Sequence, residues 1–272
     1  MKRIFHTARR LDSLLRAFPW LRQKVDAVCV EYHQIQENHS NYDMNANGER
    51  WLLQTLARRN LLKNAFDVGA NHGDWAAAVL EANPNATIHC FEICPPTFQK
   101  LAARFSENQA HARNVILNPF GLSDAPGEIK IKYCPDSDGL TTLFEVLHTQ
   151  NVKILTGNVV RGKDYCADRH ITSIDLLKMD VEGAEHLVLR GFDDVVTPEN
   201  VPVVQFEYGL ANIMTKFLLR DFYACLEGRG YRIGKLFPAS VRFREYRFQD
   251  EDFIGPNYIA ASPRVAALLS QG

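Results

Sequence analysis

Residues 66–75 read "FDVGANHGDW", a short apolar run with one carboxylate that leads into two glycines and the start of a helix. A strand, a glycine turn and a helix in succession open the nucleotide-binding α/β folds, whose ligands bind outside the carboxyl ends of the strands. From residue 65 onward, short apolar runs alternate with helical stretches. This alternation predicts an α/β fold with a parallel sheet and helices on both of its faces.

The glycine turn also restricts the kind of ligand. A dinucleotide cofactor requires the pattern G-x-G-x-x-G, because the second glycine lets the pyrophosphate approach the backbone. Here Gly69 and Gly73 are present, but Asn71 occupies the middle position. A ligand with an adenosine and no diphosphate avoids this restriction, and S-adenosylmethionine is the common example.

An acidic residue follows at the spacing that a ribose requires. The predicted strand "TIHCFE" at residues 87–92 ends in Glu92, 23 residues after Gly69. In this fold an acidic residue about 20 residues beyond the turn holds the ribose hydroxyls. We therefore expect Glu92 to bind the cofactor ribose, and Asp67 to lie beside the amino acid portion of the cofactor.

A long insertion interrupts the alternation. About 50 residues separate the third apolar run, residues 114–122, from "LLKMDV" at residues 176–181. Within them, "GEIKIKYC" at residues 127–134 alternates apolar and polar residues, which predicts one strand of an added hairpin. The segment "DGLTTLF", residues 138–144, has the composition of a loop that closes over a site.

The stretch "SIDLLKMDVEGAEHLVLRGF", residues 173–192, resembles the signature of the FkbM family of S-adenosylmethionine-dependent methyltransferases. The resemblance continues through "FDVGANHGDW", "CFEICPPTFQKL", "GLSDAPGEI" and "VVQFEYG", and it covers roughly residues 64–262. It implies a class I methyltransferase (Rossmann-like) fold with a seven-stranded sheet whose last strand is antiparallel. It also implies methylation of hydroxyl groups on sugars, glycans or secondary metabolites. The cofactor-binding positions that it implies are Asp67, Gly69, Asn71, Gly73, Glu92, Ser123 and Asp124.

Methyl transfer to a hydroxyl requires a proton acceptor, because the hydroxyl must lose its proton during attack. Asp180 is the first candidate, since it follows the central predicted strand, and Glu182 and Glu207 are expected at the same rim. Such a cluster of acids could raise the pKa of one carboxylate, or it could coordinate a hard divalent cation. We assign no residue to a metal. The other candidate bases are His72, His148 and His186.

The composition of the chain excludes several classes of protein. A net charge of −1 gives no basic surface for nucleic acid, and "NPFG" at residues 118–121 follows the third strand rather than the fourth, where enzymes that methylate bases carry a similar motif. Six cysteines without a CxxC pair indicate neither a zinc site nor a disulfide framework. No apolar run approaches the roughly 18 residues of a membrane span. We expect a cytoplasmic protein.

The chain is expected to divide into an N-terminal helical extension at residues 1–60 and a methyltransferase catalytic domain at residues 61–272. The first 24 residues carry seven Lys or Arg against one Asp, with apolar residues at helical spacing. We expect this basic amphipathic helix to pack on the domain or on a second subunit; a weak peripheral membrane contact and an organellar transit peptide are the alternatives. A homo-oligomer is left open.

Three functions compete for this sequence. The first is a methyltransferase that uses S-adenosylmethionine and acts on a small molecule or glycan with a free hydroxyl. A nucleotide-dependent oxidoreductase is disfavoured by Asn71. A scaffold that keeps the fold without catalysis has no direct support, since the expected cofactor residues are intact.

Overall fold

The computed structural model describes residues 2–107, 113–135 and 151–270, and the chain falls into two compact units, Met1–Ser40 and Asn41–Gly272. The first unit contains helices α1 (Lys2–Leu15) and α2 (Pro19–Gln36). Pro19 begins α2, a position that tolerates proline because the first backbone N–H of a helix has no partner within the helix. Near the connecting turn Leu15 is buried, and Asp12 forms an ion pair with Arg22 at 3.1 Å.

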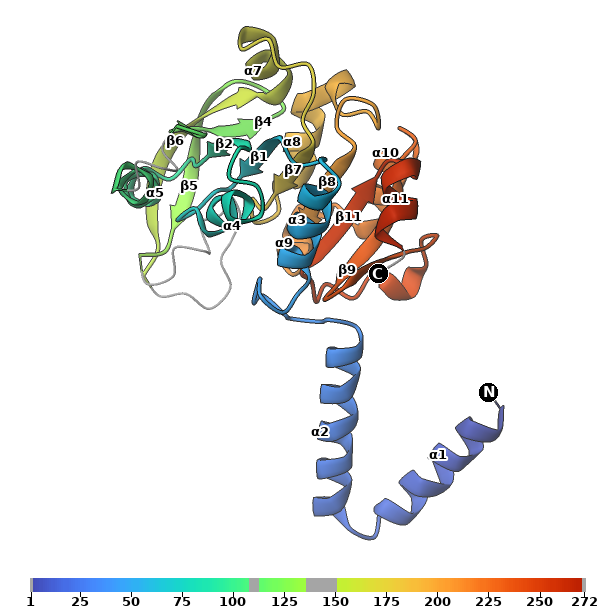
Figure 1. Cartoon of the computed structure of the whole chain (residues 1–272). Coiled ribbons are helices and arrows are strands. Elements are labelled where there is room, and N and C mark those ends of the chain that lie inside the picture. The colour runs from blue at the N-terminus through green and yellow to red at the C-terminus, as the bar shows by residue number, and fades with distance from the viewer. Residues whose placement is uncertain (1, 108–112, 136–150, 271–272) are drawn as a thin grey trace. The chain divides into compact units, whose positions relative to one another are not determined.

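The second unit is built on an eight-stranded sheet in the order β10-β9-β11-β8-β7-β1-β2-β3 (Figure 1). Five neighbouring strands are parallel, namely β3 (Val115–Asn118), β2 (Thr87–Phe91), β1 (Asn64–Val68), β7 (Leu176–Met179) and β8 (Val203–Glu207). Strand β11 (Asn257–Ala261) runs antiparallel to β8 and to β9 (Arg232–Phe237). The α/β class, the parallel sheet and the antiparallel last strand are confirmed.

The eighth strand is a difference from the expected seven. Strand β10 (Ser240–Phe243) turns back from β9 and pairs with it antiparallel, from Ser240 opposite Phe237 to Phe243 opposite Gly234. Val241 of this strand is buried in the same apolar cluster as Leu236 of β9, so the added strand extends the core at the edge of the sheet.

Two apolar clusters cover the two faces of the sheet, as the alternation predicts. One cluster includes residues of α3 (Glu49–Arg58), α4 (Asp74–Ala82), α5 (Pro95–Glu107) and α11 (Pro263–Leu269). The other includes residues of α7 (Gly162–Asp168), α8 (Glu185–Phe192) and α10 (Leu219–Glu227). The remaining short helices are α9 (Ala211–Thr215) and the 3-10 turns Asp193–Val195 and Phe248–Asp250.

Helix α3 belongs to the second unit, which begins at Asn41. Leu52, Leu53 and Leu56 are buried in the cluster on one face of the sheet. The helix starts against the sheet, since a Cβ on Gly48 would lie 2.2 Å from the carbonyl oxygen of Phe237. The predicted boundary differs from this division because the amphipathic pattern of α3 does not reveal which surface the helix covers.

The long insertion forms a second sheet in the order β4-β6-β5. Strand β5 (Gly127–Tyr133) pairs antiparallel with β6 (Lys153–Arg161), which also pairs with β4 (Gly121–Ser123). The predicted strand at residues 127–134 is thereby confirmed. The expected closing loop at residues 138–144 and His148 lie outside the described residues.

Within the described residues, no disulfide joins any of the six cysteines. No helix among the described residues has the length and apolar character that crossing a bilayer requires.

Candidate active site

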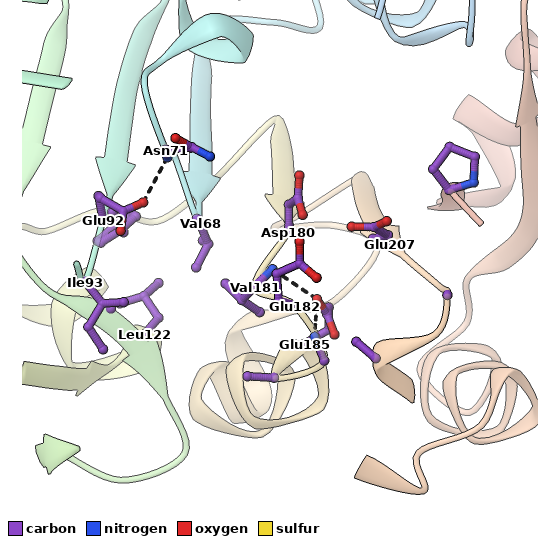
Figure 2. Close-up of a pocket in the computed structure, with 18 of the residues that line it drawn as sticks. Val68, Asn71, Glu92, Ile93, Leu122, Asp180, Val181, Glu182, Glu185 and Glu207 are labelled. Atoms are coloured by element: carbon purple, nitrogen blue, oxygen red, sulfur yellow. Dashed lines mark hydrogen bonds between the residues drawn. The ribbon is translucent and has the colours of Figure 1, made fainter. Parts of the chain in front are cut away.

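A cavity of about 560 Å³ lies at the carboxyl ends of the central strands. Val68 and Gly69 line it where β1 ends, Glu92 where β2 ends, and Asp180 where β7 ends. Figure 2 shows Asn71 and Glu92 on one side of the cavity, with Asp180, Glu182 and Glu207 across from them. The apolar wall comes partly from the second sheet, through Ile129, Ile131 and Val159. Ligands of open α/β sheets bind at this edge.

The two glycines of the opening motif have different roles. Gly69 (φ +85°) lines the cavity, and a Cβ at this position would lie 1.9 Å from the carbonyl oxygen of Asp180. Gly73 (φ +81°) precedes α4, and a Cβ there would lie 2.6 Å from the ring of Phe105 and 2.7 Å from Leu101. Gly73 does not line the cavity. The absence of a side chain at Gly73 therefore allows α4 to pack closely against α5, whereas the absence of one at Gly69 allows the turn to lie against the end of β7.

Glu92 connects the glycine turn to the end of β2. Its Oε2 accepts a hydrogen bond from the backbone N–H of Asn71 at 2.9 Å, and its Oε1 accepts one from that of Cys94 at 2.8 Å. Burial raises the pKa of Glu92. Each carboxylate oxygen can accept a further hydrogen bond. Glu92 lines the cavity and can therefore receive hydroxyl groups of a ligand while it holds the turn.

Asn71 supplies an unsatisfied polar atom beside Glu92. Its backbone is in the left-handed region (φ +47°), and its side chain lines the cavity. Within the described residues, the buried Oδ1 atom of Asn71 has no hydrogen-bond partner. Buried polar atoms in folded proteins are nearly always paired, so this atom indicates a ligand or a water molecule at the turn.

Three of the predicted cofactor residues lie outside the cavity lining. Besides Gly73, these are Asp67 and Asp124. Asp67 is fully buried, lies 3.6 Å from Nζ of Lys178, and has its pKa raised to about 7 by burial. Asp124 instead pairs with Arg190 at 3.1 Å, although the neighbouring Ser123 does line the cavity. In a strand, successive side chains point to opposite faces, so a position near the site need not face it.

The predicted catalytic residues Asp180, Glu182 and Glu207 come together. Carboxylate oxygens of the three lie within 4.8 Å of one another (Figure 2). Asp180 and Glu207 share a hydrogen bond, and Nζ of Lys178 lies 2.9 Å from Oδ2 of Asp180. Three carboxylates at this separation are also a donor set that a hard divalent cation prefers.

The carboxylates of this cluster differ in pKa. Burial alone would raise the pKa of Asp180, but the charge of Lys178 and the hydrogen bond from Glu207 together lower it. The pKa of Glu207 is raised well above its usual value by burial and by the negative charge of Asp180. Burial and Asp180 also raise the pKa of Glu182 to about 8. Asp180 is therefore the ionised member of the cluster at neutral pH.

Glu185 supports the turn that presents Glu182. Its Oε1 accepts hydrogen bonds from the backbone N–H groups of Val181 at 3.0 Å and Gly183 at 3.3 Å. Glu182 (φ +51°) and Gly183 (φ +100°) both adopt left-handed backbone conformations. The turn after β7 requires two consecutive residues in the left-handed conformation, and the hydrogen bonds to the carboxylate of Glu185 stabilise this turn.

The sequence analysis missed a group of residues that line the cavity and that come from the first and last parts of the second unit in sequence. Glu49 is buried at the start of α3, where its carboxylate accepts from Nε2 of Gln205 at 2.7 Å and from Nδ2 of Asn47 at 2.8 Å. Tyr42 and Asn257 also line the cavity. No motif or spacing relates these positions to the glycine turn, so only the folded chain reveals them.

Other candidate groups have structural partners. His186 Nδ1 lies 3.2 Å from the carbonyl oxygen of Gly183, and the ring stacks on Phe217. Neither His72 nor His186 lines the cavity. Asn118 of "NPFG" is buried and accepts a hydrogen bond from the hydroxyl of Tyr165 at 3.2 Å. The histidines within the described residues are thus weaker candidates for the base than the carboxylates.

The cavity suits a cofactor with an adenosine and a positively charged centre. Glu92 and Asn71 offer hydrogen-bond acceptors on one side, Ile93 and Leu122 offer apolar surface, and the carboxylates across the cavity attract a cation. A sulfonium carries that charge. The residues present therefore fit S-adenosylmethionine.

The strand order and the position of the cavity define a class I methyltransferase fold, in which an antiparallel strand is inserted between the last two parallel positions. Residues 67–233 match the family model for the methyltransferase FkbM domain, which is more than half of the chain. The chain belongs to the FkbM family of methyltransferases.

Several characterised proteins are similar to the chain in sequence. It is 28% identical over 195 residues to the 31-O-demethyl-FK506 methyltransferase FkbM of Streptomyces tacrolimicus, which covers 62% of this chain and 72% of that protein. It is 29% identical over 146 residues to the 2-O-methyltransferase NoeI of Sinorhizobium fredii, which covers 48% and 58%. The hexuronic acid methyltransferase AglP of Haloferax volcanii is 25% identical over 162 residues, which covers 59% and 62%. The chain thus matches less than two thirds of the length of NoeI and AglP.

Two solved structures of methyltransferases align with part of the chain. Methyltransferase FkbM from Methylobacillus flagellatus aligns with a TM-score of 0.47 and 16% identity, over 74% of this chain and 44% of that one. The O-methyltransferase TomG from Streptomyces achromogenes aligns with a TM-score of 0.42 and 12% identity, over 79% of each chain.

Proposed function

We propose that this protein transfers a methyl group from S-adenosylmethionine to a hydroxyl of a sugar, glycan or secondary metabolite. The observation that carries the proposal is the carboxylate cluster of Asp180, Glu182 and Glu207, which faces Asn71 and Glu92 across one cavity. The relatives are named for methylation of a 31-O position, a 2-O position and a hexuronic acid. These names support a hydroxyl of a polyhydroxylated molecule as the acceptor.

The cofactor supplies an activated methyl group, which transfers by in-line displacement, so the protein mainly positions two reactants and excludes water. Glu92 would accept hydrogen bonds from the ribose hydroxyls of the cofactor, beside the turn at Gly69. The buried Oδ1 atom of Asn71 would accept a hydrogen bond from a donor group of the cofactor. The apolar wall of the cavity keeps water away from the reacting groups.

The carboxylate cluster receives the proton of the acceptor hydroxyl. Lys178 keeps Asp180 ionised, so Asp180 would take this proton as the C–O bond to the methyl group forms and the bond from that methyl group to the sulfur breaks, which leaves S-adenosylhomocysteine. After the transfer, the proton is held by the carboxyl groups of Asp180 and Glu207, which are hydrogen-bonded to each other. General bases of this kind contribute roughly 100- to 10,000-fold to the rate.

Isothermal titration with S-adenosylhomocysteine tests the proposal. We expect binding to the unmodified protein, strong loss of affinity in Glu92→Ala, and little change in Asp124→Asn, because Asp124 does not line the cavity. Titration with NAD serves as a control for the oxidoreductase alternative and should give no heat of binding. If S-adenosylhomocysteine does not bind, the scaffold alternative replaces the proposal.

A further inference from the structure

Helix α2 carries an apolar stripe with the spacing of a coiled coil. The stripe consists of six residues separated alternately by three and four positions, namely Phe18 at the N-cap and Leu21, Val25, Val28, Tyr32 and Ile35 within the helix. This is the a/d spacing of a heptad repeat, in which β-branched residues and leucine form the seam between two helices. Across its 18 residues, α2 has no buried residue.

Most of this stripe is exposed among the described residues of the first unit, and of its six members only Leu21 and Val25 are partly buried. Val28, Tyr32 and Ile35 are 68%, 63% and 66% exposed. The contact between α1 and α2 lies near their connecting turn, where Asp12 pairs with Arg22. The second half of α2 therefore presents large apolar side chains that a partner helix could bury.

Two charges beside the stripe select the partner and its direction. Lys24 and Glu31 each directly precede a first position of the heptad, Val25 and Tyr32. In an antiparallel pair of helices, these flanking positions face one another across the seam. Lys24 of one copy then meets Glu31 of the other, and the symmetry of the pair repeats the contact.

We propose that the protein forms a homodimer through antiparallel pairing of α2 with α2 of a second copy. Val25 then packs against Val28 of the second copy, Leu21 against Tyr32, and Phe18 against Ile35. A parallel pair would instead place Lys24 beside Cys29 and Glu31 beside Gln36, and would gain no ion pair. The stripe residues form the centre of the interface, and the two Lys24–Glu31 pairs fix its direction.

The charge of α2 argues against a lipid surface as the occupant. The helix carries two basic residues, Arg22 and Lys24, and two acidic residues, Asp26 and Glu31, so its net charge is zero. Helices that lie on anionic membranes combine their apolar face with an excess of Lys and Arg. A second copy of α2 would bury the apolar stripe and would also supply the opposite charges for Lys24 and Glu31.

Charge reversal in the full-length protein tests the dimer by sedimentation velocity. The unmodified protein should sediment as a dimer, and Lys24→Glu or Glu31→Lys should each weaken the dimer by roughly tenfold, because two attractive pairs become repulsive. The double variant Lys24→Glu/Glu31→Lys should recover the dimer, since the reversed charges again meet. Failure of the double variant to recover would overturn the antiparallel arrangement.

A matched pair of variants tests the apolar seam. Val28→Glu places a charge in the seam and should give a monomer, whereas Val30→Glu changes another exposed valine on the opposite side of α2 and should leave the dimer intact. Binding of S-adenosylhomocysteine by both variants shows that the second unit is folded. An unmodified protein that sediments as a monomer would overturn the proposal. Equal effects of Val28→Glu and Val30→Glu on the dimer would also overturn the proposal. Binding of a monomeric unmodified protein to anionic vesicles would instead assign the stripe to a membrane surface.

Discussion

At the residue scale, Lys178 determines which carboxylate of the cluster is ionised. Its ammonium is buried and lies between Asp180 at 2.9 Å and Asp67 at 3.6 Å. Burial would lower its pKa, but the surrounding carboxylates raise it, so Lys178 stays charged. A charge that stays fixed beside Asp180 keeps this group ionised while Glu207 and Glu182 hold protons.

The first prediction concerns Asp180 as the proton acceptor. Asp180→Asn removes the base but keeps the shape of the side chain, so turnover should fall roughly 100- to 10,000-fold while cofactor affinity changes little. Initial rates with an accepted hydroxyl substrate, together with titration of S-adenosylhomocysteine, measure both effects. Asp124→Asn is the matched control and should keep full turnover. Unchanged turnover in Asp180→Asn would remove this residue from the role.

The second prediction is that turnover rises with pH. Glu182, with a pKa raised to about 8, is protonated at pH 6 and loses its proton as the pH increases, and the pKa of the neighbouring Glu207 is also raised. An ionised cluster is the stronger base, so the maximal rate should increase between about pH 6 and pH 9. Glu182→Gln removes one of these ionisations and should flatten the profile. A rate that falls over this range would contradict the proposed role of the carboxylates.

At the element scale, the turns after the strands decide where the functional side chains lie. The sequence predicts the glycine turn, Glu92 at the end of β2 and the acids at the ends of β7 and β8, because a strand end is visible as the end of an apolar run. It does not predict which side chains of a strand face the cavity: Asp67, which we expect beside the cofactor, is fully buried and lies outside the cavity lining. Glu49 lines the cavity only because α3 packs against strands that are far from it in the sequence, and the sequence pattern does not predict this long-range packing.

The third prediction tests the close approach of the β1 turn to the end of β7. Gly69→Ala forces a Cβ against the carbonyl oxygen of Asp180 in a backbone conformation that side chains rarely adopt, so it should destabilise the protein by about 1–3 kcal/mol. Gly209→Ala is the control, because its Cβ would meet only Glu207 Oε1 at 4.0 Å. Thermal unfolding compares the two variants. Equal melting temperatures would show that the turn can shift without cost.

At the scale of the whole molecule, the second unit concentrates acidic groups around its cavity. Asp67, Glu182 and Glu185 are buried or partly buried, and each has a raised pKa. Such groups suit a site for a positively charged cofactor, and they also lower the stability of the protein when they ionise. Stability given up at a functional site is common in enzymes.

The fourth prediction is that the free energy of unfolding decreases as the pH rises from about 5 to 9. A carboxylic acid with a raised pKa binds its proton more tightly in the folded state than in the unfolded state, so its contribution is fully present below the unfolded pKa. The contribution is lost as the pH passes through the folded values, about 7 for Asp67 and Glu185 and about 8 for Glu182. Glu182→Gln cannot ionise, so it should match the unmodified protein at pH 5 and unfold at a higher temperature at pH 9. A variant that is less stable than the unmodified protein at pH 9 would mean that ionised Glu182 stabilises the fold, and the acidic cluster would then be a structural ion-pair network.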